Sequence, residues 1–146
     1  MSALVIGIGH PFRHDDAVGW LVAERVAALK LANVTVLTHH GEGTDLMARW
    51  HGFDRVVLVD ATVSGTEPGV LRCWDGAEVL PTSCFPKSSH VFGVAEGVEM
   101  ARLLGRLPPF LRVIGIEAAD FSAGEGIDPA LHEAVERATA MVVDFI

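Results

Sequence analysis

Two carboxylates and one imidazole are the side chains of this sequence best suited to joint chemistry. Asp16 follows a glycine-containing loop, Asp60 ends a run of four aliphatic residues, and His90 follows two serines. Carboxylate oxygens and an imidazole nitrogen form an oxygen-rich, borderline donor set that suits Zn, Ni, Fe or Mn and leaves coordination positions open. The three residues are far apart in the chain, so they act together only if the fold brings them to one place.

Each of these residues also has a structural explanation. Asp15 and Asp16 are adjacent where a helix is expected to begin, and one carboxylate is sufficient to cap it and to meet its dipole. A carboxylate that ends an aliphatic run, as Asp60 does, must be paired or coordinated if it is buried. His90 alone is typical of a surface position or of a helix start, where the dipole keeps the imidazole neutral.

The elements that must position these residues alternate along the chain. Short apolar runs predict strands over residues 3–9, 34–37, 55–60, 70–74 and 111–116. Apolar residues at helical spacing predict helices near residues 16–29, 44–50, 90–104 and from 131 onward, with a loop over 75–89 between them. Thr44 is the expected N-cap of the second helix, and Pro129 is expected in the first turn of the last one.

This alternation predicts an α/β fold made of a single domain over residues 1–146. We expect a twisted, mostly parallel sheet of about five strands with helices on both faces. In such sheets, binding groups collect outside the carboxyl ends of the strands. Asp16, Asp60 and His90 all fall at that edge by sequence position, where they either form one metal-contacting site or keep the separate structural roles described above.

Composition and charge exclude several classes of partner. A formal net charge of −8 argues against nucleic acid or an anionic membrane as the main partner, although an acidic surface also simply aids solubility. No secretory signal and no apolar run near the ~20 residues of a membrane span are evident. Cys73 and Cys84 lack the spacing of a metal or redox motif, which fits a cytoplasmic location.

Competing sites are weaker. The Gly7-x-Gly9 turn resembles the start of a dinucleotide-binding loop, but the third glycine is missing and the adjacent carboxylates would repel a pyrophosphate. Cys84 either pairs with His90 as a nucleophile or is an ordinary loop cysteine. His39 and His40 follow the second strand, where they either line the same edge or merely form a polar strand end.

Four segments together resemble the nickel–iron hydrogenase maturation endopeptidases. GIGHPFRHDDAVG, residues 7–19, resembles the signature G-x-G-N-x-x-R-G-D-D-G-V-G of that family. VVLVDAT, which ends at Thr62, is similar to the second block of the family, and SSHVFG, residues 88–93, is similar to the third. VIGIEAADFSAGEGIDP, residues 113–129, is similar to the last block, and all four occur in the family's order.

The resemblance implies a specific activity. Members of the family remove a short C-terminal extension from the hydrogenase large-subunit precursor once nickel has been inserted. Their metal-contacting Asp or Glu, Asp and His match Asp16, Asp60 and His90. The resemblance therefore implies an endopeptidase, and we expect Asp16, Asp60 and His90 to be its catalytic and metal-contacting residues. Because an oxygen-rich site holds a borderline ion less tightly than thiolates do, we expect nickel to arrive mostly on the precursor as a recognition element, with other divalent metals able to substitute. The precursor is then the partner, and we expect a monomer because no long apolar edge or heptad is present.

The chain departs from the family pattern around the first carboxylate. His10 stands where Asn is usual, His14 and Ala17 where Gly is usual, Ala118 where Pro is usual, and Asp128 where Ser is usual. The two extra imidazoles either add metal ligands and alter metal preference or simply face solvent.

Three aromatic residues have two possible roles. They either form a docking patch or belong to the core: Phe12, Phe92 and Phe121.

Two other functions compete with the endopeptidase. One is a small-molecule metallohydrolase with a resident ion, and the other is a checkpoint protein that binds metal-loaded precursor without cutting it. For peptide cleavage, water is the expected nucleophile, with an Asp carboxylate as general base. A metal ion would polarise the scissile carbonyl or lower the pKa of bound water toward ~7.

Overall fold

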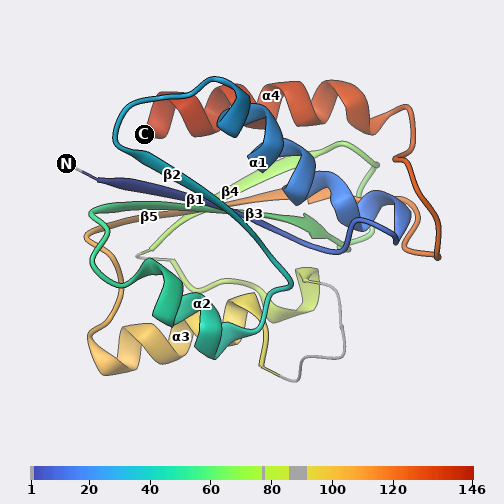
Figure 1. Ribbon diagram of the computed structural model, residues 1–146. Helices are drawn as coiled ribbons and strands as arrows, with labels where there is room; N and C mark the ends of the chain where they lie inside the picture. Colours follow the sequence, from blue (N-terminus) through green and yellow to red (C-terminus); the bar gives the residue numbers. More distant parts are fainter. Residues whose placement is uncertain (1, 77, 86–91) are drawn as a thin grey trace.

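A five-stranded sheet separates two layers of helices in the computed structural model of the chain (Figure 1), which describes residues 2–76, 78–85 and 92–146. The strands are β1 (Ala3–Ile8), β2 (Val34–His39), β3 (Arg55–Thr62), β4 (Leu71–Asp75) and β5 (Phe110–Glu117). Their order in the sheet is β2-β1-β3-β5-β4, and every pairing is parallel except that of β4 with β5. The predicted α/β fold with a mostly parallel sheet is confirmed.

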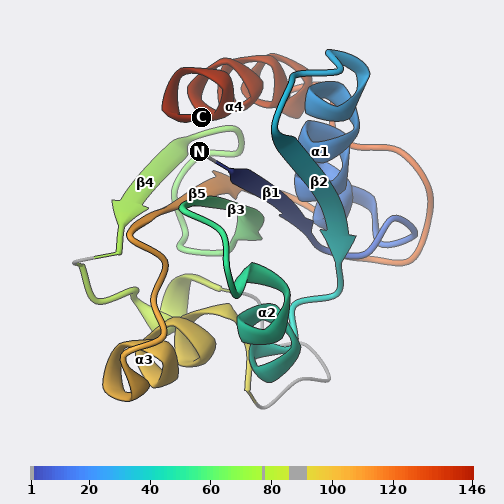
Figure 2. The ribbon, with the colours of Figure 1, turned by 60° about the vertical axis from the view of Figure 1, so that its left-hand side comes forward.

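Helices cover both faces of this sheet, as Figures 1 and 2 show. The helices are α1 (Val18–Ala28), α2 (Gly43–Trp50), α3 (Val94–Leu104) and α4 (Leu131–Phe145), with short 3-10 turns η1 (His14–Ala17) and η2 (Thr82–Cys84). Successive side chains of β3 lie on opposite faces of the sheet. Val57 and Val59 pack with α1 and α4, whereas Val56 and Leu58 pack with α2 and α3. Because both faces are buried, the inner strands are continuous apolar runs. None of the helices in the described residues is long and apolar enough to cross a membrane.

Two predicted helix starts are wrong. The N-cap of α2 is Glu42 instead of Thr44, because the longer carboxylate reaches forward to accept hydrogen bonds from the N–H groups of Thr44 (3.0 Å) and Asp45 (2.8 Å). Pro129 does not lie in the first turn of α4, because that helix has Ala130 as its N-cap.

The start of α3 also differs from the prediction. The helix begins at Val94, with Gly93 as N-cap and the Gly93 N–H donating to the Glu96 side chain at 3.0 Å. It ends at Leu104 with Gly105 as C-cap, in agreement with the predicted end near Gly105. The predicted start of this helix near His90 is therefore wrong. His90 itself falls in residues 86–91, outside the described residues.

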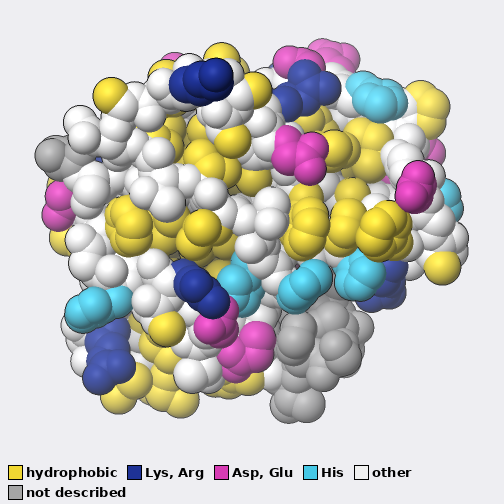
Figure 3. All heavy atoms as spheres, viewed as in Figure 1, with side chains coloured by type: hydrophobic (Ala, Val, Ile, Leu, Met, Phe, Trp, Pro, Cys, Tyr) yellow, Lys and Arg dark blue, Asp and Glu magenta, His cyan; other side chains and the backbone are white. Residues whose placement is uncertain are grey.

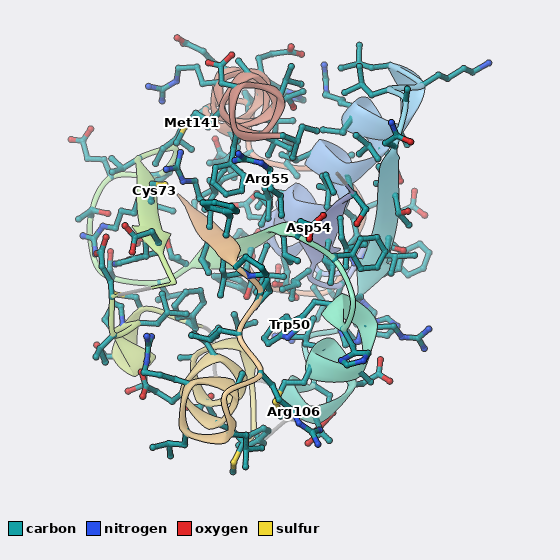
Figure 4. All side chains as sticks on the ribbon, turned by 90° about the vertical axis from the view of Figure 1, so that its left-hand side faces the viewer. Trp50, Asp54, Arg55, Cys73, Arg106 and Met141 are labelled. Carbon is teal, nitrogen blue, oxygen red and sulfur yellow. The ribbon has the colours of Figure 1, made fainter. Side chains whose placement is uncertain are left out.

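Near the amino ends of the strands, the side chains of Arg55 and Trp50 donate hydrogen bonds to backbone carbonyl groups of other segments. The Arg55 guanidinium lies 4.6 Å from the centre of the Phe110 ring and donates to the Phe145 carbonyl at 3.2 Å, which links β3 to α4. Figure 4 shows Arg55 on the α4 side of the sheet and Trp50 on the α2–α3 side. The Trp50 indole donates to the Arg106 carbonyl at 3.1 Å. The opposite, carboxyl edge is thus the one at which Asp60 lies.

The backbone at the start of α1 lies in direct contact with the backbone near the carboxyl ends of β1 and β3. A Cβ atom added to Gly7 would lie 2.2 Å from the Gly19 carbonyl oxygen. One added to Gly19 would lie 2.3 Å from the carbonyl oxygen of Ile8 and 2.4 Å from that of Val59. No side chain fits at either position, so the glycines let η1 and its carboxylates reach the carboxyl edge of β3.

We expect Gly19→Ala to lower the free energy of unfolding by about 3 kcal/mol, because the added methyl group forces the α1 backbone away from β1 and β3. Urea unfolding monitored by circular dichroism measures the loss. Gly52→Ala is the control, since Gly52 has φ +87° but no atom within 4 Å of an added Cβ. That control is expected to lose only about 1 kcal/mol through backbone strain. Equal losses in the two variants would contradict the close-contact explanation.

Candidate active site

The fold brings Asp16 and Asp60 to one place at the carboxyl edge of the sheet. Asp60 lies near the end of β3, paired in register with Gly115 of β5, and only 5% of its surface is exposed. Asp16 lies in η1, with 8% of its surface exposed, close enough for its charge to raise the pKa of Asp60. These two members of the expected trio share an environment, whereas the third, His90, lies outside the described residues.

Both carboxyl groups resist ionisation. Burial raises the pKa of Asp60 well above the usual carboxyl range, the negative charge of Asp16 raises it further, and a hydrogen bond from the Ala61 N–H (2.8 Å) partly opposes the shift. Burial also raises the pKa of Asp16, against the lowering effect of Arg13 and His10. A proton shared by the two carboxyl groups, or a cation bound beside them, reduces the repulsion between two buried negative charges. The pair therefore offers the oxygen donors that a borderline divalent ion accepts.

Asp15, next to Asp16, has a different role. It is fully buried, and its Oδ2 accepts hydrogen bonds from the N–H groups of Ala119 and Asp120, both at 2.8 Å. Its Oδ1 accepts a third hydrogen bond from the N–H of Asp128 at 2.8 Å. No side-chain hydrogen bond caps η1, so the expectation that one of the paired carboxylates caps this turn is wrong. Asp15 instead ties η1 to the segment between β5 and α4.

His14 belongs to the same connection. Its backbone N–H donates to the Gly124 carbonyl at 3.0 Å, and its Nδ1 lies 3.0 Å from the Gly126 carbonyl oxygen. A Cβ added to Gly124 would lie 2.3 Å from the His14 Nε2, so the ring packs directly on that glycine. The imidazole of His14 thus supports the loop instead of facing Asp16. Phe12 is 57% exposed and lies outside the core.

Glu117 is a fourth buried carboxylate at this edge, and the sequence analysis missed it. Its oxygens accept hydrogen bonds from the Thr62 hydroxyl (2.9 Å), from both the hydroxyl and the N–H of Ser64 (2.8 and 2.9 Å), and from the Gly65 N–H (3.2 Å). Burial alone would raise the pKa of Glu117, but these hydrogen bonds lower it below the usual value. The residue fixes the chain just after β3. Its position at the end of an apolar run, the same signal that marks Asp60, could have revealed it.

The remaining candidates have structural roles. Cys84 is buried, and its Sγ lies 3.5 Å from a guanidinium nitrogen of Arg72. His39 links β2 to α2, because its Nε2 lies 2.6 Å from an Asp45 oxygen and its Nδ1 accepts from the Gly41 N–H at 2.8 Å. Among residues 2–76, 78–85 and 92–146, no group of three or more His, Cys, Asp or Glu side chains is arranged to hold a metal ion.

Fold and site together define an α/β protein with a pair of buried carboxyl groups at the carboxyl edge of a parallel sheet. The model of the hydrogenase maturation protease family matches residues 21–145, and the chain belongs to this family. The match includes Asp60 and begins just after Asp16. The family resemblance expected from the sequence is confirmed.

Relatives named hydrogenase expression/formation protein HupD match most of the chain. The protein from Bradyrhizobium diazoefficiens is 33% identical over 120 residues, which are 80% of this chain and 62% of the relative. The protein from Thiocapsa roseopersicina is 27% identical over 147 residues, which are 98% of this chain and 66% of the relative. The chain thus spans just under two thirds of the length of these relatives.

Solved structures share the fold. The hydrogenase maturating endopeptidase HybD from E. coli superposes with a TM-score of 0.81 at 22% identity, over 99% of this chain and 91% of that chain. The maturation protease HycI from Thermococcus kodakarensis superposes with a TM-score of 0.74 at 26% identity, over the same shares of the two chains.

We expect Asp60→Asn to stabilise the protein at neutral pH. Because the folded pKa of Asp60 is raised, the folded state holds a proton that the unfolded state has lost, and stability falls as pH rises from about 4 through the folded pKa. Each unit of upshift corresponds to about 1.4 kcal/mol of stability that the variant regains above that range. Below pH ~4 the two proteins should converge.

Urea unfolding across this pH range tests the expectation. Asp144→Asn, at an exposed position on α4, is the matched control and should show no such pH-dependent gain. A loss of stability in Asp60→Asn at neutral pH would show that an ionised Asp60 stabilises the fold.

Proposed function

We propose that this protein is an endopeptidase that removes the C-terminal extension of a nickel–iron hydrogenase large-subunit precursor after nickel insertion. The observation that carries the proposal is the buried Asp16–Asp60 pair, in a chain that belongs to the hydrogenase maturation protease family. The name of the E. coli structural neighbour, a hydrogenase maturating endopeptidase, supports the same activity. Asp16, Asp60 and His90 are the proposed catalytic and nickel-contacting residues.

Nickel is proposed to arrive on the precursor. Two carboxylates and an imidazole hold a borderline ion less tightly than cysteine thiolates do, so the free protein does not strip the metal from its carrier. The carboxyl pair nevertheless gains from a nearby cation, because burial and mutual repulsion destabilise both negative charges. A precursor that carries a divalent ion relieves this repulsion, whereas a metal-free precursor does not. The pair thereby makes nickel the recognition element, and other divalent ions can substitute.

The proposed nucleophile is water. A carboxyl group whose pKa is raised toward neutrality is a better general base and acid than an ordinary carboxylate, and Asp60 has the larger upward shift of the pair. Asp60 would take the proton from the attacking water and return it to the leaving amine. Asp16, held in η1 by the anchoring of Asp15, would orient the nickel-bearing end of the precursor.

We further propose a cytoplasmic monomer that does not act at membranes or on nucleic acid. The formal net charge of −8 opposes binding to polyanions. Cys73 and Cys84 are both free thiols, as a reducing compartment favours.

Asp16→Asn and His90→Ala are each expected to lower precursor cleavage by at least ~100-fold, because each removes a group that contacts the nickel or moves a proton. Mass spectrometry of the nickel-loaded precursor before and after mixing measures the cleavage, and circular dichroism verifies folding. His132→Ala, at an exposed position on α4, is the matched control and should cleave normally. Full activity in either test variant would refute the role of that residue.

Nickel-free precursor is expected to stay uncut under conditions in which nickel-loaded precursor is processed, since only the loaded form neutralises the carboxyl pair. Equal cleavage of the two forms would reject nickel as the recognition element. A stoichiometric resident ion in the purified protein would favour the small-molecule metallohydrolase instead. Binding of the loaded precursor without a change in its mass would favour the non-cleaving checkpoint.

A further inference from the structure

Beside the candidate active site, four ring side chains contact one another in a row. The ring centre of His10 lies 6.4 Å from that of Phe12 and 5.7 Å from that of His40, and the Trp20 ring lies 5.6 Å from His40. His10 closely follows β1 and His40 follows β2, and these parallel strands are paired in register up to Ile8 and His39. Both imidazoles are exposed. Figure 3 shows histidine side chains close together on this face, below a row of hydrophobic ones.

Two of the histidines at this edge are already engaged, and two have nitrogens available. His39 uses both ring nitrogens, and His14 uses its Nδ1 on the Gly126 carbonyl. In His10, Nδ1 receives only a long contact from the Phe12 N–H at 3.4 Å, which leaves Nε2 available. Within the described part of the chain, the His40 ring has ring contacts and no hydrogen-bond partner.

The spacing of these two rings suits a shared metal ion. An imidazole nitrogen lies about 2.0–2.1 Å from a bound divalent ion such as zinc, so two rings on one ion have their centres roughly 5–6 Å apart at tetrahedral or wider angles. The observed separation is 5.7 Å, with the ring planes tilted by 47°. Asp16 lies close enough to His10 for their charges to interact, and its carboxylate attracts a cation to this place. Trp20 packs on His40 and restricts the orientations of that ring.

We propose that His10 and His40 bind one borderline divalent cation, of the Ni²⁺, Cu²⁺ or Zn²⁺ class, through one nitrogen of each ring. Imidazole suits these ions, and water completes the coordination. The site is distinct from the Asp16–Asp60 pair, because its donors are imidazoles from the β1 and β2 ends. With two protein ligands it holds the ion weakly and exchanges it readily. Binding here requires neither the precursor nor the proposed peptidase activity.

Isothermal titration of the purified protein with NiCl₂, without precursor, tests this site. One nickel ion per chain is expected to bind. His10→Ala and His40→Ala should each weaken the binding by tenfold or more, because even the loss of a residue that only orients a ligand costs about 10–100-fold. His51→Ala and His132→Ala, which remove exposed histidines elsewhere, are the matched controls and should bind as the unchanged protein does.

A second readout identifies the ligands. Cu²⁺ bound to the protein should give an electron paramagnetic resonance spectrum with coupling to two imidazole nitrogens, reduced to one in either test variant. Loss of binding in Asp60→Asn with retention in His10→Ala would assign the ion to the carboxyl pair and overturn the proposal. Absence of nickel binding by the unchanged protein would overturn it too, without bearing on precursor cleavage.

Discussion

The backbone contact between Gly7 and Gly19 is the constraint on which the site depends. A helix normally keeps its axis well away from a sheet because side chains lie between them. Here the first turn of α1 touches the carbonyl groups at the ends of β1 and β3 directly. The short η1 turn therefore lies over the end of β3, and two acidic residues reach a region from which water is largely excluded. Larger residues at either glycine would separate Asp16 from Asp60.

Buried acidic residues at this edge divide into two kinds according to the donors around them. Asp15 accepts three backbone hydrogen bonds and Glu117 accepts four hydrogen bonds, so their charges are compensated within the protein. Asp60 accepts one hydrogen bond from its neighbour Ala61, and burial outweighs it. Asp15 and Glu117, whose charges are balanced by hydrogen-bond donors, hold loops in place. Asp16 and Asp60 lack enough donors to balance their charges, so the pair can respond to a ligand. Proximity in the sequence does not decide between these roles, since Asp15 and Asp16 are adjacent.

Local patterns predicted the elements well and the partners of polar side chains poorly. The apolar runs identified every strand, because β1, β3 and β5 are buried on both faces. One of Asp15 and Asp16 was expected to cap the helix start, but the donors to Asp15 lie in a segment more than a hundred residues away in the sequence, and no local rule reaches that far. Likewise, the role of His14 depends on the Gly126 carbonyl, which lies 112 residues away in the sequence. Long-range hydrogen bonds decided each of these cases.

The order of the strands has a consequence for synthesis. In the sheet, β4 pairs only with β5, yet β4 precedes β5 in the chain. While the polypeptide leaves the ribosome, β4 has no strand to pair with, and one side of β3 is an open edge. Only when β5 inserts between them does Gly115 come to lie beside Asp60 and Glu117 beside Thr62. The surroundings of Asp60 are therefore complete only after β5 has been synthesised and has paired with β3.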